Sequence, residues 1–317
     1  MGVAVGRGRA GVSVVFFGSS EFAIRPLEAI ADEISLVVTQ PPRPAGRGRR
    51  LTRTPVHDRA EQLGLPVEAP ARCRDEAFVA RVRGLEPLAL IVASYGQILP
   101  KALLDAAPRG GINLHASLLP KYRGAAPIQR AILNGERTTG VTLMQMDEGC
   151  DTGPVIASVE TEIGDDETAG ELEARLSSLA AELLVGQWAS LRDGTYVSIP
   201  QDDSLATTAP KMRREDGALR FDEPADLAYR RFRAATPKPG CHLPVGDGYV
   251  LVVSARPAGA ASLQPGAFVG FEGDAMVVAF AEGTSLAVGS VLPPGKKEMP
   301  GRAFVAGRRW RPGERLT

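Results

Sequence analysis

The stretch that decides the fold reads Leu-Ala-Leu-Ile-Val-Ala at residues 88–93 and resumes as Gly-Ile-Asn-Leu-His at residues 111–115. Both runs are short and largely apolar, as expected for buried strands. Similar runs alternate with helical patterns through the first two thirds of the chain. The runs are 12–17, 34–38 and 141–146, and the helical patterns include 74–83 and 125–133. This alternation is typical of βαβ units and predicts an α/β fold with a mostly parallel sheet.

The clearest single helix is predicted to begin at Thr168. Thr168 and Glu171 have the spacing of a capping box, in which each side chain bonds the backbone N–H of the other residue. Leucines follow at helical spacing, at Leu172, Leu176, Leu179 and Leu183. We expect this helix to end before Gly194.

The pattern changes from about residue 196. Residues 200–210 are polar and have no period, so we interpret them as a linker. After a predicted helix at 226–234, short apolar runs are separated by glycine-containing turns, at 249–254, 267–271, 275–281 and 284–288. This spacing predicts a small β-barrel or sandwich. We therefore divide the chain into a first domain, residues 1–206, and a linker with a β-barrel domain, residues 207–317.

Composition is that of an ordinary globular protein. Hydrophobic residues make up 44% of the chain and charged residues 23%, and no apolar run approaches the ~20 residues of a membrane span. Basic and acidic residues are equal at 37 each, so net charge predicts no polyanion partner. The three cysteines and three histidines lack the spacing of a disulfide framework or a metal site. We expect a cytoplasmic protein with no metal and no membrane contact.

One glycine motif points to a function that its position excludes. Residues 6–11 match the letters G-x-G-x-x-G of dinucleotide-binding proteins. Those glycines must lie between a strand and the helix that follows it, whereas these precede the first predicted strand. The turn that follows this strand, at residues 18–22, contains one glycine. We therefore expect no dinucleotide site.

Two polar residues share one face of the predicted strand at 111–115. Asn113 and His115 are two positions apart, so their side chains point the same way. Asp147 and Asp151 follow the next strand in a polar loop. An amide, an imidazole and a carboxylate that meet at the carboxyl ends of strands would suit acyl transfer. The alternatives are a core histidine beside a loop asparagine, and aspartates in a solvated turn.

Residues 111–153 resemble the catalytic core of the folate-dependent formyltransferases. The likeness rests on Asn-x-His at 113–115, Ser-Leu-Leu-Pro-Lys-Tyr-Arg-Gly at 117–124 and Asp-Thr-Gly at 151–153. Further stretches resemble the methionyl-tRNA formyltransferases more closely, at 39–48, 95–100, 124–129, 140–147, 209–211 and 307–316. Together they span nearly the whole chain after its first residues.

The resemblance implies a Rossmann-like formyltransferase domain followed by an OB-like β-barrel domain. The implied reaction transfers the formyl group of 10-formyltetrahydrofolate to the α-amine of methionine on initiator tRNA. Asn113 and His115 would donate hydrogen bonds to the oxygen of the tetrahedral intermediate. Asp151 would orient a charged His115 or accept the amine proton through water. The sequence leaves open which of the two residues takes that proton.

The resemblance also implies folate contacts in two short segments. They are Ser117, Leu118, Leu119 and Pro120, and Tyr95, Gln97 and Ile98. Without the family likeness, the second segment would be interpreted as a plain loop between a strand and a helix. The expected donor is thus 10-formyltetrahydrofolate.

Arginine is concentrated locally although the net charge is zero. Residues 41–59 carry six arginines and a single acid, without an apolar period that could pack into a core. By the resemblance, this loop reaches the acceptor stem of tRNA, and Arg47 is the residue most implicated. The basic residues expected to contact tRNA are Arg43, Arg47, Arg49, Lys211 and Arg213. The alternative is an ordinary solvated charged surface.

Other functions remain open at this point. They are a formyltransferase acting on an amino sugar nucleotide or a purine precursor, a hydrolase of formyl-folate, and an RNA-binding protein without catalysis. The arginine-rich loop favours tRNA, because a small acceptor does not need a mobile basic arm. Departures from the family pattern at Pro42, Thr208 and residues 236–240 leave the predicted catalytic residues untouched. We expect a monomer.

Overall fold

The computed structural model describes residues 13–45 and 50–317. The predicted tRNA contacts Arg47 and Arg49, and the glycine motif at 6–11, lie outside the described residues. The chain divides into two compact units. The first is Met1–Pro127, Thr138–Glu162 and Glu173–Ala209, and the second is Ile128–Arg137, Ile163–Leu172 and Pro210–Thr317. The second unit therefore includes two segments from the first two thirds of the chain.

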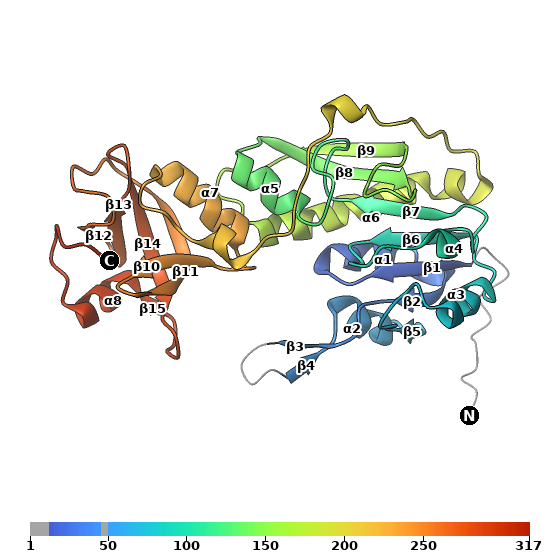
Figure 1. The fold of residues 1–317 in the computed structure, drawn as a ribbon, viewed down its shortest axis with the longest axis horizontal. Coiled ribbons are helices and arrows are strands. Elements are labelled where there is room, and N and C mark those ends of the chain that lie inside the picture. Colours follow the sequence, from blue (N-terminus) through green and yellow to red (C-terminus); the bar gives the residue numbers. More distant parts are fainter. Residues whose placement is uncertain (1–12, 46–49) are drawn as a thin grey trace. The chain divides into compact units, whose positions relative to one another are not determined.

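A seven-stranded sheet forms the centre of the first unit, in the order β5-β2-β1-β6-β7-β8-β9 (Figure 1). The strands are β1 (Val14–Gly18), β2 (Ile34–Val38), β5 (Val67–Glu68), β6 (Ala89–Ala93), β7 (Gly111–His115), β8 (Thr138–Gln145) and β9 (Val155–Glu162). All pairs from β5 to β7 are parallel, whereas β8 and β9 are antiparallel to their neighbours. This confirms the predicted α/β fold with a mostly parallel sheet.

Strands β1, β2, β6, β7 and β8 correspond to the predicted apolar runs, and β5 and β9 were not predicted. Strand β5 has only two residues, too few to show a pattern. Strand β9 lies at the edge of the sheet, and its residues are half-buried or exposed. An edge strand of this kind lacks the continuous apolar run by which the central strands are recognised.

Helices follow these strands along the chain, and two of them pack apolar side chains against the sheet. They are α1 (Ile24–Ala29), α2 (Pro55–Gln62), α3 (Glu76–Arg83), α4 (Lys101–Leu104), α5 (Pro127–Asn134) and α6 (Ala169–Asp193), with 3₁₀ turns η1 (Glu21–Ala23), η2 (Ala31–Glu33) and η3 (Asp203–Leu205). Phe78 and Val82 of α3 and Leu103 of α4 belong to one buried cluster with Phe17 of β1 and Val92 of β6. This cluster joins the two helices to β1 and to β6, which lies next to β7, the strand that carries Asn113 and His115.

Helix α6 begins and ends where the sequence predicts. The Thr168 N–H donates to Glu171 Oε2 at 2.9 Å, and the Glu171 N–H donates to Thr168 Oγ1 at 3.4 Å. These bonds with Thr168 lower the pKa of Glu171. The helix stops at Asp193, and Gly194 follows with a φ of 72°. The capping box and its glycine stop are confirmed.

An antiparallel sheet forms the second unit, in the order β10-β11-β14-β13-β12 with β15 beside β14 (Figure 1). Its elements are η4 (Arg214–Gly217), α7 (Ala225–Ala235), β10 (Cys241–Val245), β11 (Gly248–Ala258), β12 (Phe268–Glu272), β13 (Ala275–Ala279), β14 (Ser285–Leu292), β15 (Met299–Pro300) and α8 (Gly301–Arg308). The Leu316 N–H donates to the Gly266 oxygen, and the Gly246 N–H donates to the Leu316 oxygen. The last residues therefore join the two ends of this sheet. The predicted helix is confirmed, and the predicted small β domain is confirmed as an antiparallel β domain.

Two segments predicted to lack structure are ordered by backbone hydrogen bonds. In the arginine-rich loop, β3 (Arg43–Ala45) and β4 (Arg50–Thr52) form an antiparallel pair. In the predicted linker, residue Thr208 forms a parallel bridge with Arg123. Neither segment has an apolar period, and a pattern of side chains cannot reveal order that rests on backbone pairing. No helix within residues 13–45 and 50–317 is long and apolar enough to cross a membrane.

Candidate active site

Strand β7 carries two polar side chains into the interior. Asn113 pairs with Val92 of β6 on one side and with Met144 of β8 on the other. Asn113 is 8% exposed and His115 is 6% exposed. Because the positions are two apart on a strand, both side chains share one face of the sheet. Buried polar groups are costly unless they are hydrogen-bonded, so their partners matter.

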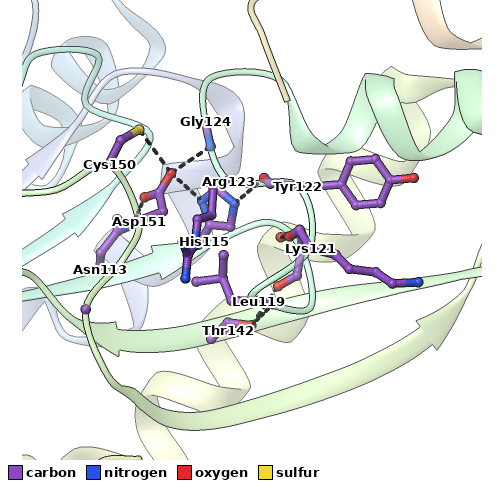
Figure 2. A network of polar contacts seen from close by, with 12 residues as sticks. Asn113, His115, Leu119, Lys121, Tyr122, Arg123, Gly124, Thr142, Cys150 and Asp151 are labelled. Carbon is purple, nitrogen blue, oxygen red and sulfur yellow. Dashed lines mark hydrogen bonds and ion pairs between the residues drawn. The ribbon is translucent and has the colours of Figure 1, made fainter. Parts of the chain in front are cut away.

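The loop after β8 brings Asp151 to these two residues (Figure 2). Asn113 Nδ2 donates to Asp151 Oδ1 at 3.3 Å, and His115 Nδ1 lies 3.6 Å from Asp151 Oδ2. The Gly124 N–H donates to the same Oδ2 at 2.9 Å. Asp151 has a φ of 55°, a left-handed conformation that non-glycine residues rarely adopt and that is frequent at functional sites. The structure thus brings together the three side chains predicted to be catalytic.

The hydrogen bonds of His115 determine which ring nitrogen carries a proton. Nε2 lies 2.9 Å from the backbone oxygen of Tyr122. A carbonyl oxygen can only accept, so Nε2 carries the hydrogen. In the neutral ring Nδ1 is therefore the basic atom, and Nδ1 is the atom that faces Asp151. Any proton transfer by His115 must take place at Nδ1.

Two neighbours in the loop help to hold Asp151. Asp147 accepts from the Gly149 N–H at 3.0 Å and from the Thr152 hydroxyl at 2.7 Å, so its carboxylate closes the turn. The Cys150 thiol donates to Asp151 Oδ2 across 3.7 Å. Burial raises the pKa of Cys150, and the negative charge of Asp151 raises it further. The thiol therefore keeps its proton and remains a donor.

The predicted folate contacts of the first segment differ in what they can offer a ligand. The Ser117 hydroxyl is buried and donates to the Lys121 oxygen at 2.7 Å, so it is used within its own loop. The Leu119 N–H donates to Thr142 Oγ1 at 3.1 Å, which fixes the loop on β8. Residues 118–120 are half-buried and present apolar surface.

The second segment of predicted folate contacts also contains both residues that are engaged within the protein and a residue that is exposed. Tyr95 is 2% exposed, its ring packs edge-on against Phe17, and burial raises the pKa of its hydroxyl. Gln97 Oε1 accepts from the Cys73 N–H at 2.9 Å, so its side chain holds the loop before α3. Ile98 is 85% exposed. Within this segment the accessible side chain is Ile98, and the other two support the backbone beneath it.

The described basic residues predicted to contact tRNA are exposed. Arg43 lies in β3 and donates from Nη2 to Gln40 Oε1 at 2.7 Å. Lys211 and Arg213 belong to the second unit, where the Arg213 backbone N–H donates to Asp216 Oδ2 at 2.8 Å. All three residues are exposed, and one guanidinium nitrogen of Arg43 is engaged by Gln40.

Sequence reasoning missed a cleft and the residues that hold the site from behind. The cleft has a volume of about 510 Å³ and is lined by residues from 101–110 and 145–148 and by Tyr196. Gln201 donates from Nε2 to the backbone oxygens of Asp151 and Gly153, at 2.9 and 2.7 Å. These features depend on chain segments that meet only after folding, and no spacing in the sequence indicates them.

Comparison with known proteins shows the family of the chain. The formyl transferase family matches residues 14–187, and the formyl transferase C-terminal domain matches residues 211–309. A methionyl-tRNA formyltransferase of Halorhodospira halophila is 43% identical over 305 residues, which are 95% of this chain and 98% of the relative. The chain belongs to the methionyl-tRNA formyltransferase family. The resemblance expected from the sequence motifs is therefore confirmed.

Two further proteins, one known from its sequence and one from a crystal structure, are also similar to this chain. The methionyl-tRNA formyltransferase of Solibacter usitatus is 42% identical over 307 residues, 96% of this chain and 98% of the relative. The crystal structure of WlaRD, a sugar 3N-formyl transferase in the presence of dTDP and 5-N-formyl-THF, matches with a TM-score of 0.64. It is 18% identical and covers 90% of this chain and 99% of its own, a likeness that shows the fold alone. Within the described residues, no cluster of histidine, cysteine and carboxylate groups is arranged to hold a metal ion.

Proposed function

We propose that this chain transfers the formyl group of 10-formyltetrahydrofolate to the α-amine of methionine on initiator tRNA. The observation that carries the proposal is the meeting of Asn113, His115 and Asp151 at one buried point, in a chain 43% identical to a methionyl-tRNA formyltransferase. We further propose that the enzyme works in the cytoplasm as a monomer and needs no metal.

The hydrogen bonds support a separate role for each residue. Asn113 donates one N–H to Asp151, and its second N–H is the donor for the oxyanion that forms when the amine attacks the formyl carbon. Nδ1 of neutral His115 takes the proton of the attacking amine, because Nε2 is held by Tyr122. The protonated ring then faces Asp151, whose charge stabilises it, until the proton passes to the leaving folate nitrogen. In this proposed order of steps, His115 transfers the proton and Asp151 stabilises the positive charge on the ring.

The donor's binding site would use the surface that the two predicted folate segments leave accessible. The half-buried residues 118–120 and the exposed Ile98 offer apolar contact for the rings of the folate. Ser117, Tyr95 and Gln97 support these contacts from beneath, because their polar atoms are engaged or buried. Folate chemistry is also compatible with the fold, since WlaRD was crystallised with 5-N-formyl-THF.

The acceptor would be held by charge. Arg43, Arg47 and Arg49 come from the arginine-rich loop, and Lys211 and Arg213 are exposed in the second unit. Phosphate contacts of this kind make binding weaken steeply with salt. A small acceptor such as a sugar nucleotide would need fewer such contacts, which favours tRNA over the alternative acceptors.

The test uses purified protein and 10-formyltetrahydrofolate labelled in the formyl group. Parallel reactions contain initiator Met-tRNA, an amino sugar nucleotide, or buffer alone. We expect label on Met-tRNA, with neither sugar labelling nor release of formate at a comparable rate. Label on the sugar, or formate release independent of any acceptor, would replace the proposal with the corresponding alternative.

A further inference from the structure

Part of the predicted linker, residues 201–209, forms a segment that we call the strap. It contacts two loops that we call the catalytic loops: the loop after β8 that contains Asp151, and the loop after β7 that contains Arg123 and Gly124. These residues belong to the first unit together with the loops they contact. Most of the strap is exposed and polar, and its contacts are hydrogen bonds rather than apolar packing. A segment of this kind is normally a passive connection between domains. Its bonds are instead concentrated on the residues that position the catalytic side chains.

Gln201 holds the backbone of Asp151. Its Nε2 donates to the Asp151 oxygen at 2.9 Å and to the Gly153 oxygen at 2.7 Å. Asp151 adopts a φ of 55°, and a residue in this conformation stays there only where its surroundings favour it. The two bonds from Gln201 to the backbone of this loop supply that support.

The other end of the Gln201 amide holds the second catalytic loop. Arg123 donates to Gln201 Oε1 from Nε at 3.1 Å and from Nη2 at 2.8 Å. Arg123 precedes Gly124, whose N–H donates to Asp151 Oδ2. One amide therefore links the loop that supplies the carboxylate to the loop that supplies a donor to that carboxylate.

The rest of the strap holds the same loop by backbone pairing and by the side chains of Asp203 and Thr207. The Arg123 N–H donates to the Thr207 oxygen at 2.9 Å, and the Ala209 N–H donates to the Arg123 oxygen at 2.7 Å. Thr207 Oγ1 accepts from the Tyr122 N–H at 2.9 Å. The oxygen of that same residue, Tyr122, anchors His115. Both catalytic side chains thus depend on backbone that the strap positions.

We infer that Gln201 is a positioning residue for formyl transfer, acting through the backbone of Asp151 and the Arg123–Gly124 loop. Both ends of its side-chain amide are engaged by protein groups. Its loss would let Asp151 move relative to His115 Nδ1 while leaving the surfaces offered to folate and tRNA in place. The inference rests on the proposed function, because it assumes that Asp151 takes part in the reaction.

The inference predicts a loss in kcat rather than in substrate binding. Gln201→Ala removes all four bonds of the amide, whereas Gln201→Glu keeps an acceptor for Arg123 but turns a carboxylate oxygen toward two carbonyl oxygens. Misplacement of a reacting group by about 1 Å costs roughly 100-fold in rate. We expect both variants to lose about 10- to 100-fold in kcat, with KM for each substrate changed by less than about threefold.

Asp202→Asn is the matched control. Asp202 is the next residue, and its carboxylate accepts from the Ser204 N–H at 3.0 Å without contacting the catalytic loops. We expect this variant to keep the kcat of the parent enzyme. Thermal unfolding of all variants, expected within about 3 °C of the parent, excludes general loss of structure.

The outcomes separate this inference from the proposed function. If kcat of both Gln201 variants stays within about threefold of the parent, or if KM rises while kcat holds, the positioning role is refuted. Asp151→Ala is measured alongside with the same substrates. If Asp151→Ala is inactive while the Gln201 variants are fully active, the inference fails and the proposed function stands. If Asp151→Ala keeps normal turnover, the catalytic role of Asp151 fails, and the inference fails with it.

Discussion

Replacing Asp151 by asparagine removes the charge that faces His115 while keeping the size of the side chain. In the proposed reaction Nδ1 of His115 becomes positively charged, 3.6 Å from Asp151 Oδ2. At an effective dielectric constant of ~20, the Coulomb attraction over that distance is about 4 to 5 kcal/mol. At 1.36 kcal/mol per tenfold, losing most of it slows the reaction by roughly 1000-fold.

Single-turnover transfer of labelled formyl groups to initiator Met-tRNA measures this loss without interference from product release. We expect the rate constant of Asp151→Asn to fall roughly 1000-fold, with the affinities for folate and tRNA largely kept. Asp147→Asn is the matched control, because Asp147 lies in the same loop and bonds Gly149 and Thr152 but not His115. We expect this control to lose less than about tenfold. A rate for Asp151→Asn equal to that of the control would show that the carboxylate does not stabilise a charged ring.

Three other predictions test separate parts of the structure. Gly124 has a φ of 123°, and a Cβ on it would lie 2.8 Å from the Ala209 oxygen. Gly124→Ala should therefore lower the free energy of unfolding, measured by urea titration, by about 1–3 kcal/mol. The control Gly186→Ala, which places its Cβ in open space, should not lower it. Arg47→Ala should raise KM for Met-tRNA much more than KM for folate, and an unchanged tRNA dependence in steady-state kinetics would remove this assignment. Burial, together with a neighbouring arginine, lowers the pKa of His242 below its ordinary 6.5. The unfolded chain then binds the proton more readily, so His242 should make stability fall as the pH drops below about 6.5, and His242→Leu should show less of that fall in urea unfolding.

The strand predictions were correct for strands that are buried on both faces of the sheet. Strands β6 and β7 are buried along their whole length, so they required apolar residues at nearly every position. Asn113 and His115 therefore stood out as polar exceptions in an apolar run. The capping box at Thr168 was equally readable, because both partners lie within one turn of each other in the chain.

The sequence did not predict the segments whose order depends on backbone hydrogen bonds to residues far away in the chain. The strap holds Arg123 through Thr207 and Ala209, which are more than eighty positions away, and its side chains are mostly exposed. A pattern of residue types cannot show which N–H will meet which oxygen at that separation. Elements β10, β15 and α8 of the second unit were also not predicted.

The amino-acid sequence by itself was sufficient to predict the family and the mostly parallel sheet, and to single out the three polar side chains. Apolar periodicity and short motifs involve residues close together in the chain, so they can be recognised without the structure. Folding alone settled that Nδ1 of His115 faces Asp151 and that Gln201 bridges two loops. These relations are distances between atoms tens of positions apart, and they arise only when the sheet and its connecting segments have packed.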